Sequence, residues 1–140
     1  MQKISALGLD VGRRRIGVAG CDGLGLMATG LTTIKRTSFD GVLAELKAIV
    51  IERDVRVLVV GLPYSMSGDL GSQAKETQKF ATRLSEGLQL PVEFVDERLS
   101  SIEAKGLLSD RRRTSGNKAE IDRVAAALIL QRWLDRRRHS

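Results

Sequence analysis

Asp10 is the first of three acidic residues placed where a carboxylate could do chemistry. It interrupts a stretch of small and apolar residues, 4–11, that is typical of a buried strand, and Gly12 then supplies a turn. Because side chains alternate along a strand, Asp10 shares a face with Gly8 and Gly12, which leave room for a large group. An ionised carboxylate buried without partners is costly, so Asp10 must meet a cation, a donor or water. The alternative is a turn-proximal aspartate that accepts bonds only from backbone amides.

Glu97 is the second acid, and it follows the predicted short strand 92–95. Ligands of open α/β sheets usually bind outside the carboxyl ends of the strands, which is where Glu97 is expected. Asp96 and Glu97 alternate across the strand, so only one of them can face such a site. We choose Glu97 of the two.

Asp122 is the third acid, and it belongs to a predicted helix over residues 118–137. It shares one helix face with apolar residues that follow it by four, seven and eleven positions. An acid on an otherwise apolar face is expected to point toward the sheet, and the neighbouring alanines let the helix approach closely. The alternative is a buried ion pair with an arginine such as Arg98 or Arg123.

The chemistry open to this chain follows from the residue types that it has and lacks. The single histidine, His139, and the single cysteine, Cys21, cannot form a Ser–His or Cys–His catalytic unit. Three converging carboxylates repel one another unless a hard cation such as Mg²⁺ lies between them. In a two-metal site, one ion activates the attacking water and the other stabilises the leaving oxygen of a phosphodiester. The acids therefore predict metal-assisted phosphodiester hydrolysis, with Mg²⁺ or Mn²⁺ as cofactor.

Composition is consistent with a nucleic-acid partner. The 140 residues include 23 basic and 17 acidic side chains, which gives a formal net charge of +6 and a pI near 10.0. A positive balance favours polyanions, although it also serves solubility. The length predicts one domain, residues 1–140. No apolar run approaches a membrane span and no leader is visible, so we expect a cytoplasmic protein with no membrane partner.

Arginine triplets and one glycine-rich loop are the expected contacts to phosphate. The planar guanidinium suits phosphate, and backbone amides at a helix start can bind it as well. The segment 109–116 is expected to close over bound RNA. The residues predicted to contact nucleic acid are Arg13, Arg14, Arg15, Gly68, Gly71, Ser72, Arg98, Arg111, Arg112, Arg113 and Lys118. The alternatives are solvated charges for the triplets, a third triplet at 136–138 included, and a plain connector for the loop.

Strand and helix patterns alternate along the chain. The expected elements are a hairpin over 4–19, a third strand over 24–34, a helix over 39–53, a strand over 55–61, a helix capped by Ser72 and running to about residue 87, a strand over 92–95, a helix over 100–109, and the helix over 118–137. This order predicts an α/β layer with a mixed sheet, in which antiparallel hairpin strands come first and parallel strands follow.

The motifs resemble those of the YqgF/RuvX proteins along nearly the whole chain. The matching segments are 7–12 with 15–19, 60–63 with Met66, Gly68, Gly71 and Ala74, 95–100 with Ala104, and 121–131. This resemblance implies an RNase H-like fold with a five-stranded mixed sheet flanked by helices. It also implies a nuclease that processes the 5′ end of precursor 16S rRNA, acting on that RNA or on a ribosomal particle as monomer or homodimer. By the same analogy Asp10, Glu97 and Asp122 are the catalytic acids and metal ligands.

The resemblance extends to Holliday-junction resolvases of the RuvC type, with one departure. Those proteins carry a second acid one turn away on the last helix, whereas Ala119 and Ala125 flank Asp122 here. A fully occupied two-metal site is therefore in question, and the substrate is expected to help bind a second ion.

Three other functions stay open. A resolvase of branched DNA uses the same chemistry and needs a dimer that places two sites across a junction. A non-catalytic RNA-binding assembly factor needs no acids. An actin-like or sugar-kinase ATPase shares the opening motif, but it closes two such domains around its nucleotide.

Overall fold

The computed structural model describes residues 3–63, 71–96 and 118–138. Its elements are, in chain order, β1 (Ala6–Val11), β2 (Arg15–Cys21), β3 (Ala28–Lys35), α1 (Phe39–Arg53), β4 (Val57–Leu62), α2 (Ser72–Leu88), β5 (Val92–Asp96) and α4 (Lys118–Arg138). The helix predicted over 39–53 has the bounds expected of it. The helix predicted over 100–109, the segment 109–116 and most of the glycine-rich loop lie outside the described residues.

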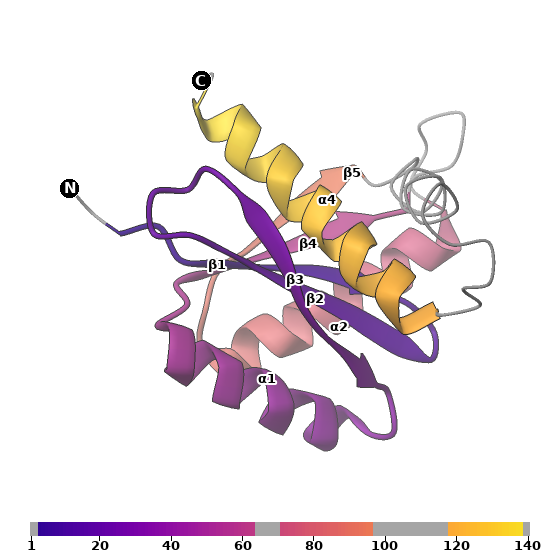
Figure 1. Ribbon diagram of the computed structural model, residues 1–140. Helices are drawn as coiled ribbons and strands as arrows, with labels where there is room; N and C mark the ends of the chain where they lie inside the picture. The colour runs from indigo at the N-terminus through magenta and orange to yellow at the C-terminus, as the bar shows by residue number, and fades with distance from the viewer. Residues whose placement is uncertain (1–2, 64–70, 97–117, 139–140) are drawn as a thin grey trace.

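One mixed sheet of five strands organises the described chain, in the order β3-β2-β1-β4-β5. β1 pairs with β2, and β2 with β3, in antiparallel fashion, while β1 to β4 and β4 to β5 are parallel. This arrangement confirms the predicted mixed sheet. Figure 1 shows α1 and α2 together on one side of the sheet and α4 crossing the other side.

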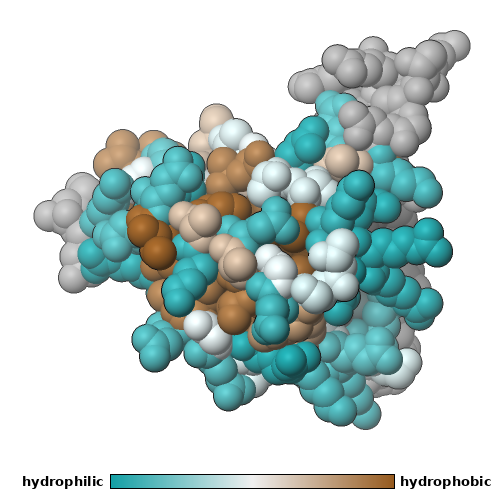
Figure 2. Space-filling model, turned by 90° about the horizontal axis from the view of Figure 1, so that it is seen from below, coloured by the Kyte–Doolittle hydropathy of each residue, from teal (hydrophilic) through white to brown (hydrophobic). Residues whose placement is uncertain are grey.

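The two sides of the sheet bury different side chains. Large apolar residues of the strands, such as Leu7 and Leu9, pack with Leu46 of α1 and Leu84 of α2, and all four are fully buried. The opposite side packs smaller strand residues against α4. In Figure 2, which views the molecule from below, apolar side chains gather over the middle and left, with hydrophilic residues around them. None of the described helices is long and apolar enough to cross a membrane.

The backbone of α4 nearly touches the sheet. Glycines on three neighbouring strands, Gly8, Gly17 and Gly30, face this helix. A Cβ added to Gly8 would lie 2.8 Å from the carbonyl oxygen of Ala126, and one added to Gly17 would lie 2.0 Å from that of Asp122. A side chain has no room at either position, and strand glycines commonly mark such a close backbone approach.

Local hydrogen bonds explain where three element boundaries differ from the expected ones. The Asp22 carboxylate accepts bonds from the amides of Leu24, Leu26 and Met27, so a loop replaces the predicted start of the third strand and β3 begins at Ala28. The amide of Val55 donates to the end of α1, so β4 begins at Val57. The predicted Ser72 cap is wrong, because Gly71 is the N-cap of α2 and no side chain bonds there.

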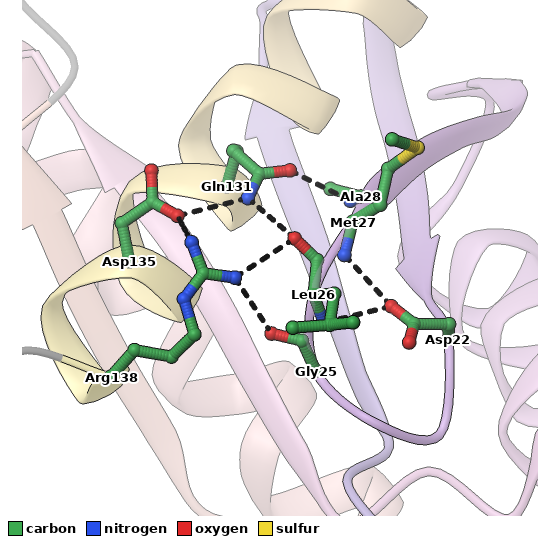
Figure 3. A network of polar contacts seen from close by, with 8 residues as sticks. All are labelled: Asp22, Gly25, Leu26, Met27, Ala28, Gln131, Asp135 and Arg138. Atoms are coloured by element: carbon green, nitrogen blue, oxygen red, sulfur yellow. Dashed lines mark hydrogen bonds and ion pairs between the residues drawn. The ribbon is translucent and has the colours of Figure 1, made fainter.

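The carboxyl-terminal half of α4 holds the β2–β3 loop (Figure 3). The Gln131 side chain accepts a bond from the amide of Ala28 at 2.8 Å and donates to the carbonyl oxygen of Leu26 at 3.0 Å. Arg138 also donates to that carbonyl oxygen, at 3.1 Å, and it pairs with Asp135. At least one arginine of the triplet 136–138 is therefore bonded within the fold, which differs from the expected solvated charge.

Candidate active site

Asp10 and Asp122 meet over Gly17. In the β1–β2 pair Asp10 lies directly opposite Gly17, so both face α4. Opposite Cβ positions in such a pair are about 4.5 to 5.5 Å apart. A Cβ added to Gly17 would lie 3.1 Å from the Cβ of Asp122. The β-carbons of the two acids are therefore within about 9 Å of each other, close enough for their carboxylates to share a cation.

Asp122 forms an ion pair with Arg15 of β2. The Nε–H of Arg15 donates to Oδ2 of Asp122 at 2.6 Å, and the two side chains are 32% and 18% exposed, respectively. The sequence-based alternative was a pair with Arg98 or Arg123. Arg98 lies outside the described residues, and the Cβ of Arg123 lies beside Gly30 of β3 instead. A pairing of Asp122 with arginine is thus correct, but the partner comes from a distant strand.

The space expected beside Asp10 is occupied on one side by the protein itself. Asp10 is half-buried and has a bonding partner. Gly8 makes room for α4 rather than for a ligand. On the other side, the amide of Gly12 donates to the carbonyl oxygen of Arg15 at 2.9 Å and closes the turn. The glycines therefore serve helix docking and the turn.

The third predicted acid, Glu97, lies outside the described residues, but its neighbour can be placed. In β5 the side chain of Glu93 accepts a bond from Trp133 of α4, and Val95 packs in the same cluster as α4. Phe94 packs on the opposite side, with the core of α1 and α2. By alternation Asp96 belongs to the side of Phe94, away from Asp10. Asp96 is therefore not expected beside Asp10, and the role of Glu97 stays a prediction.

Two carboxylates form the acidic part of the site that the structure describes. Among residues 3–63, 71–96 and 118–138, no group of three His, Cys, Asp or Glu side chains is close enough to hold a metal ion. Asp10 and Asp122 supply oxygen donors of the kind that Mg²⁺ and Mn²⁺ prefer. The donor set fits such an ion as two of its ligands, with further positions for water and phosphate oxygens.

The predicted nucleic-acid contacts divide into three groups. Arg13 and Arg14 are exposed at the β1–β2 turn, and Gly71, Ser72 and Lys118 are exposed at the starts of α2 and α4. Arg15 faces α4 and pairs with Asp122. The remaining predicted residues, Gly68, Arg98, Arg111, Arg112 and Arg113, lie outside the described residues.

Arg36 joins the β1–β2 turn to α2, a role that sequence reasoning missed. Its guanidinium donates to the carbonyl oxygen of Gly12 at 2.7 Å and lies 4.1 Å from the ring centroid of Phe80. Its amide donates to the carbonyl oxygen of Arg14 at 2.9 Å. A small cleft of about 60 Å³ brings Arg13 and Arg36 together with the first turns of α2. In the sequence, the position of Arg36 directly after the edge strand β3 was the signal that could have identified this role.

The fold and the site define a class of protein. The order β3-β2-β1-β4-β5, with an aspartate on the central strand facing a helix that carries another, is an RNase H-like arrangement. RuvC from Thermus thermophilus, solved in complex with a Holliday junction substrate, has this fold with a TM-score of 0.57 and 13% sequence identity, over 96% of each chain. At that identity the likeness concerns the fold alone.

Sequence relatives identify the family. The family model described as "RuvX: Holliday junction resolvase" matches residues 4–136, so the chain belongs to this family. A protein of Gloeothece citriformis is 64% identical over 138 residues, covering 98% of this chain and 91% of its own length. One of Rippkaea orientalis is 62% identical over 139 residues, covering 99% and 100%. Both carry the name "Putative pre-16S rRNA nuclease".

Proposed function

We propose that this protein is a divalent-metal-dependent nuclease that hydrolyses phosphodiester bonds at the 5′ end of precursor 16S rRNA. The observation that carries the proposal is the nearness of Asp10 and Asp122 over Gly17, because these acids come from separate elements and lie on the same face of the sheet. Family membership and the names of the relatives support the reaction class and the RNA substrate. The expected place of action is the cytoplasm.

Each side chain has a proposed part in the reaction. Asp10 and Asp122, with Glu97 as the proposed third acid, would hold Mg²⁺ or Mn²⁺, which would activate water and stabilise the leaving oxygen. The exposed Arg13, Arg14 and Lys118 would hold the RNA backbone, since phosphate contacts position a nucleic acid without reading its sequence. Gly71 and Ser72 would offer amide groups at the start of α2, where no side chain bonds.

Cleavage of branched DNA is the second candidate, because the description of the family names Holliday junction resolvase. The same acids and metal would serve either substrate. A resolvase must also present two sites across one junction, so it would act as a dimer. Substrate preference and oligomeric state therefore separate the two candidates.

The test is cleavage of matched substrates by the purified protein. Precursor 16S rRNA, single-stranded RNA and a four-way DNA junction are each incubated with Mg²⁺, with Mn²⁺ or with a chelator. We expect metal-dependent cleavage of the precursor and little cleavage of the junction. Cleavage of the DNA junction alone would favour the resolvase over the RNA nuclease. Absence of cleavage of every substrate with either metal would overturn the proposal that this protein is a nuclease.

Replacement of the acids is expected to separate cleavage from binding. Asp10→Asn and Asp122→Asn should each lower the cleavage rate by more than about 100-fold. Even substitutions of residues that only hydrogen-bond to metal ligands typically lower metal affinity or activity by about 10- to 100-fold. RNA affinity should stay equal or rise, since a charge that repels phosphate is removed. Glu45→Gln is the matched control, because it removes one exposed acid from α1 on the other side of the sheet. Cleavage by Asp10→Asn at the wild-type rate would remove Asp10 from the site.

A further inference from the structure

Arg15 differs from the two arginines that precede it. Arg13 and Arg14 are exposed at the turn, whereas Arg15 begins β2 on the face toward α4, the face that Gly17 shares. Its side chain is 32% exposed and is tied to Asp122. The triplet therefore contains two arginines available to solvent and one that lies inside the candidate site.

The position of Arg15 brings its charge to both acids. Asp10 lies opposite Gly17, and Arg15 precedes Gly17 by two residues on the same face, so Arg15 is the diagonal neighbour of Asp10. Diagonal neighbours are about 7 to 8 Å apart, within reach of a side chain as long as arginine. The guanidinium thus supplies positive charge where the two carboxylates converge.

We infer that Arg15 is a positioning residue that holds Asp122 in the metal-free protein and releases it when a divalent cation binds, its guanidinium then being free to meet a phosphate of the substrate. The inference rests on the proposed function, because it takes the acids as the place of the cation. It assigns to Arg15 a function that is distinct from the general phosphate binding expected of the triplet.

The nature of the ion pair favours such an exchange. A single Nε–H bond joins Arg15 to Asp122 among the contacts of the described residues, rather than the two parallel bonds of a forked pair. Arg15 is 32% exposed and Asp122 is 18% exposed, so water screens this ion pair in part and weakens it. Two cations at one carboxylate repel each other, so an arriving metal ion disfavours the guanidinium. A released guanidinium has a planar fork that matches phosphate.

Mn²⁺ binding to the free protein, measured by electron paramagnetic resonance, tests the competition without any nucleic acid. Loss of the Arg15 charge removes a repulsion between two cations at one carboxylate, and water screens that repulsion in part because Arg15 is 32% exposed. We therefore expect Arg15→Gln to bind Mn²⁺ about tenfold more tightly, which corresponds to about 1.4 kcal/mol. Arg15→Lys keeps the charge and should stay within about threefold of the wild type.

Two controls assign this effect to the ion pair. Arg14→Gln removes the same charge from the neighbouring residue, whose side chain has no hydrogen bond or ion pair within the described part of the chain, so Mn²⁺ affinity should change less than twofold. In an Asp122→Asn background, Arg15→Gln should no longer raise the affinity. Equal tightening by Arg14→Gln and Arg15→Gln would show a general charge effect and overturn the inference.

The exchange itself has a spectroscopic signature. In the metal-free protein the Nε–H of Arg15 should give a protected nuclear magnetic resonance signal, assigned by its loss in Arg15→Lys. Saturation with Mg²⁺ should shift this signal and speed its exchange with solvent. An unchanged Nε–H signal at saturating Mg²⁺ would show that Arg15 stays on Asp122 and would overturn the inference.

The outcomes also separate this inference from the proposed function. Tighter Mn²⁺ binding by Arg15→Gln, in a protein that cleaves neither RNA nor DNA, would support the role of Arg15 and overturn the nuclease. Normal cleavage with equal Mn²⁺ affinity in the wild type and Arg15→Gln would support the nuclease and overturn the role of Arg15. Absence of Mn²⁺ binding in both proteins would overturn the cation site and the inference together.

Discussion

The two faces of the sheet are built on different packing rules. On the face covered by α1 and α2, the strands present large apolar side chains, among them Leu7, Leu9 and Leu58, which are completely buried. On the face covered by α4, the strands present smaller residues, among them Gly8, Ala19 and Val59, together with Asp10. The first face is an ordinary hydrophobic core. The second face allows the backbone of α4 to approach the backbone of the strands.

This difference explains why the candidate site lies on one face only of the described fold. Large side chains fill the space between a helix and a sheet, and they leave no place for a carboxylate that is half open to solvent. Glycines let α4 descend until its backbone meets β2 at Gly17, which brings Asp122 down beside Asp10. The close approach therefore positions the acids as well as adding packing.

Adding a methyl group under α4 is the most severe way to break this arrangement. Gly17→Ala would place its Cβ 2.0 Å from a backbone carbonyl oxygen, so the helix must move. We expect a loss of about 3 kcal/mol or more, the upper part of the range for overpacking. Chemical denaturation measures this loss, and the remaining folded protein should cleave poorly.

Gly87→Ala is the matched substitution on the other face. Its Cβ would meet the end of the Leu43 side chain at 2.8 Å, which can rotate, and alanine is a better helix former than glycine. We expect a change of less than about 1 kcal/mol. Equal losses for Gly17→Ala and Gly87→Ala would contradict the difference between the faces.

The second prediction concerns the other half of α4. Gln131→Ala removes the bonds that the side chain makes to Ala28 and Leu26, and it leaves backbone groups of the β2–β3 loop to water. We expect a loss of about 1 to 2 kcal/mol in the free energy of unfolding. Cleavage per folded molecule should not change, because this contact is remote from Asp122. A loss of cleavage without a loss of stability would show that the two halves of α4 are coupled.

The smallest expected effect is a pH dependence at the same loop. Hydrogen bonds from the backbone amides of Met27, Leu26 and Leu24 lower the pKa of Asp22 below its ordinary value of 3.8. Because the folded-state pKa is the lower one, this stabilisation is present above about pH 4 and is lost as the pH falls through the folded-state value. The melting temperatures of the wild type and Asp22→Asn should therefore converge below pH 4. A constant difference from pH 7 to pH 3 would exclude this linkage.

Local patterns predicted the elements of this fold well. The helix α1 has its apolar residues at helical spacing, which predicted its bounds. Its N-cap Ser38, which was not part of the prediction, accepts a bond from the amide of Gly41. The order of strand patterns gave the mixed sheet. Boundaries differed where a side chain bonded the backbone, as Asp22 does, because such bonds compete with strand pairing and leave little mark in the composition.

The candidate site could be predicted only in part. Asp10 stood out as an acid within a buried strand, and Asp122 as an acid on an apolar helix face. The structure brings the two near each other over Gly17, and their role as metal ligands stays a prediction. The pairing of Asp122 with Arg15 depends on how α4 lies across β2, which no local pattern encodes. The alternation of side chains along β2 did contain a signal for this pairing, because Arg15 shares its strand face with Gly17 and Ala19. Arg13 and Arg14 do not. Glu97 stays a prediction.

The chain distance across the site has a consequence for the order of folding. Arg15 and Asp122 are 107 residues apart, and every described strand precedes α4. Closing so long a loop is entropically costly, and non-local contacts of this kind form slowly. We expect the β1–β2 hairpin to exist well before Asp122 arrives. A nascent chain would then carry Asp10 without Asp122 beside it, so the proposed cleavage activity would appear only after synthesis has passed α4.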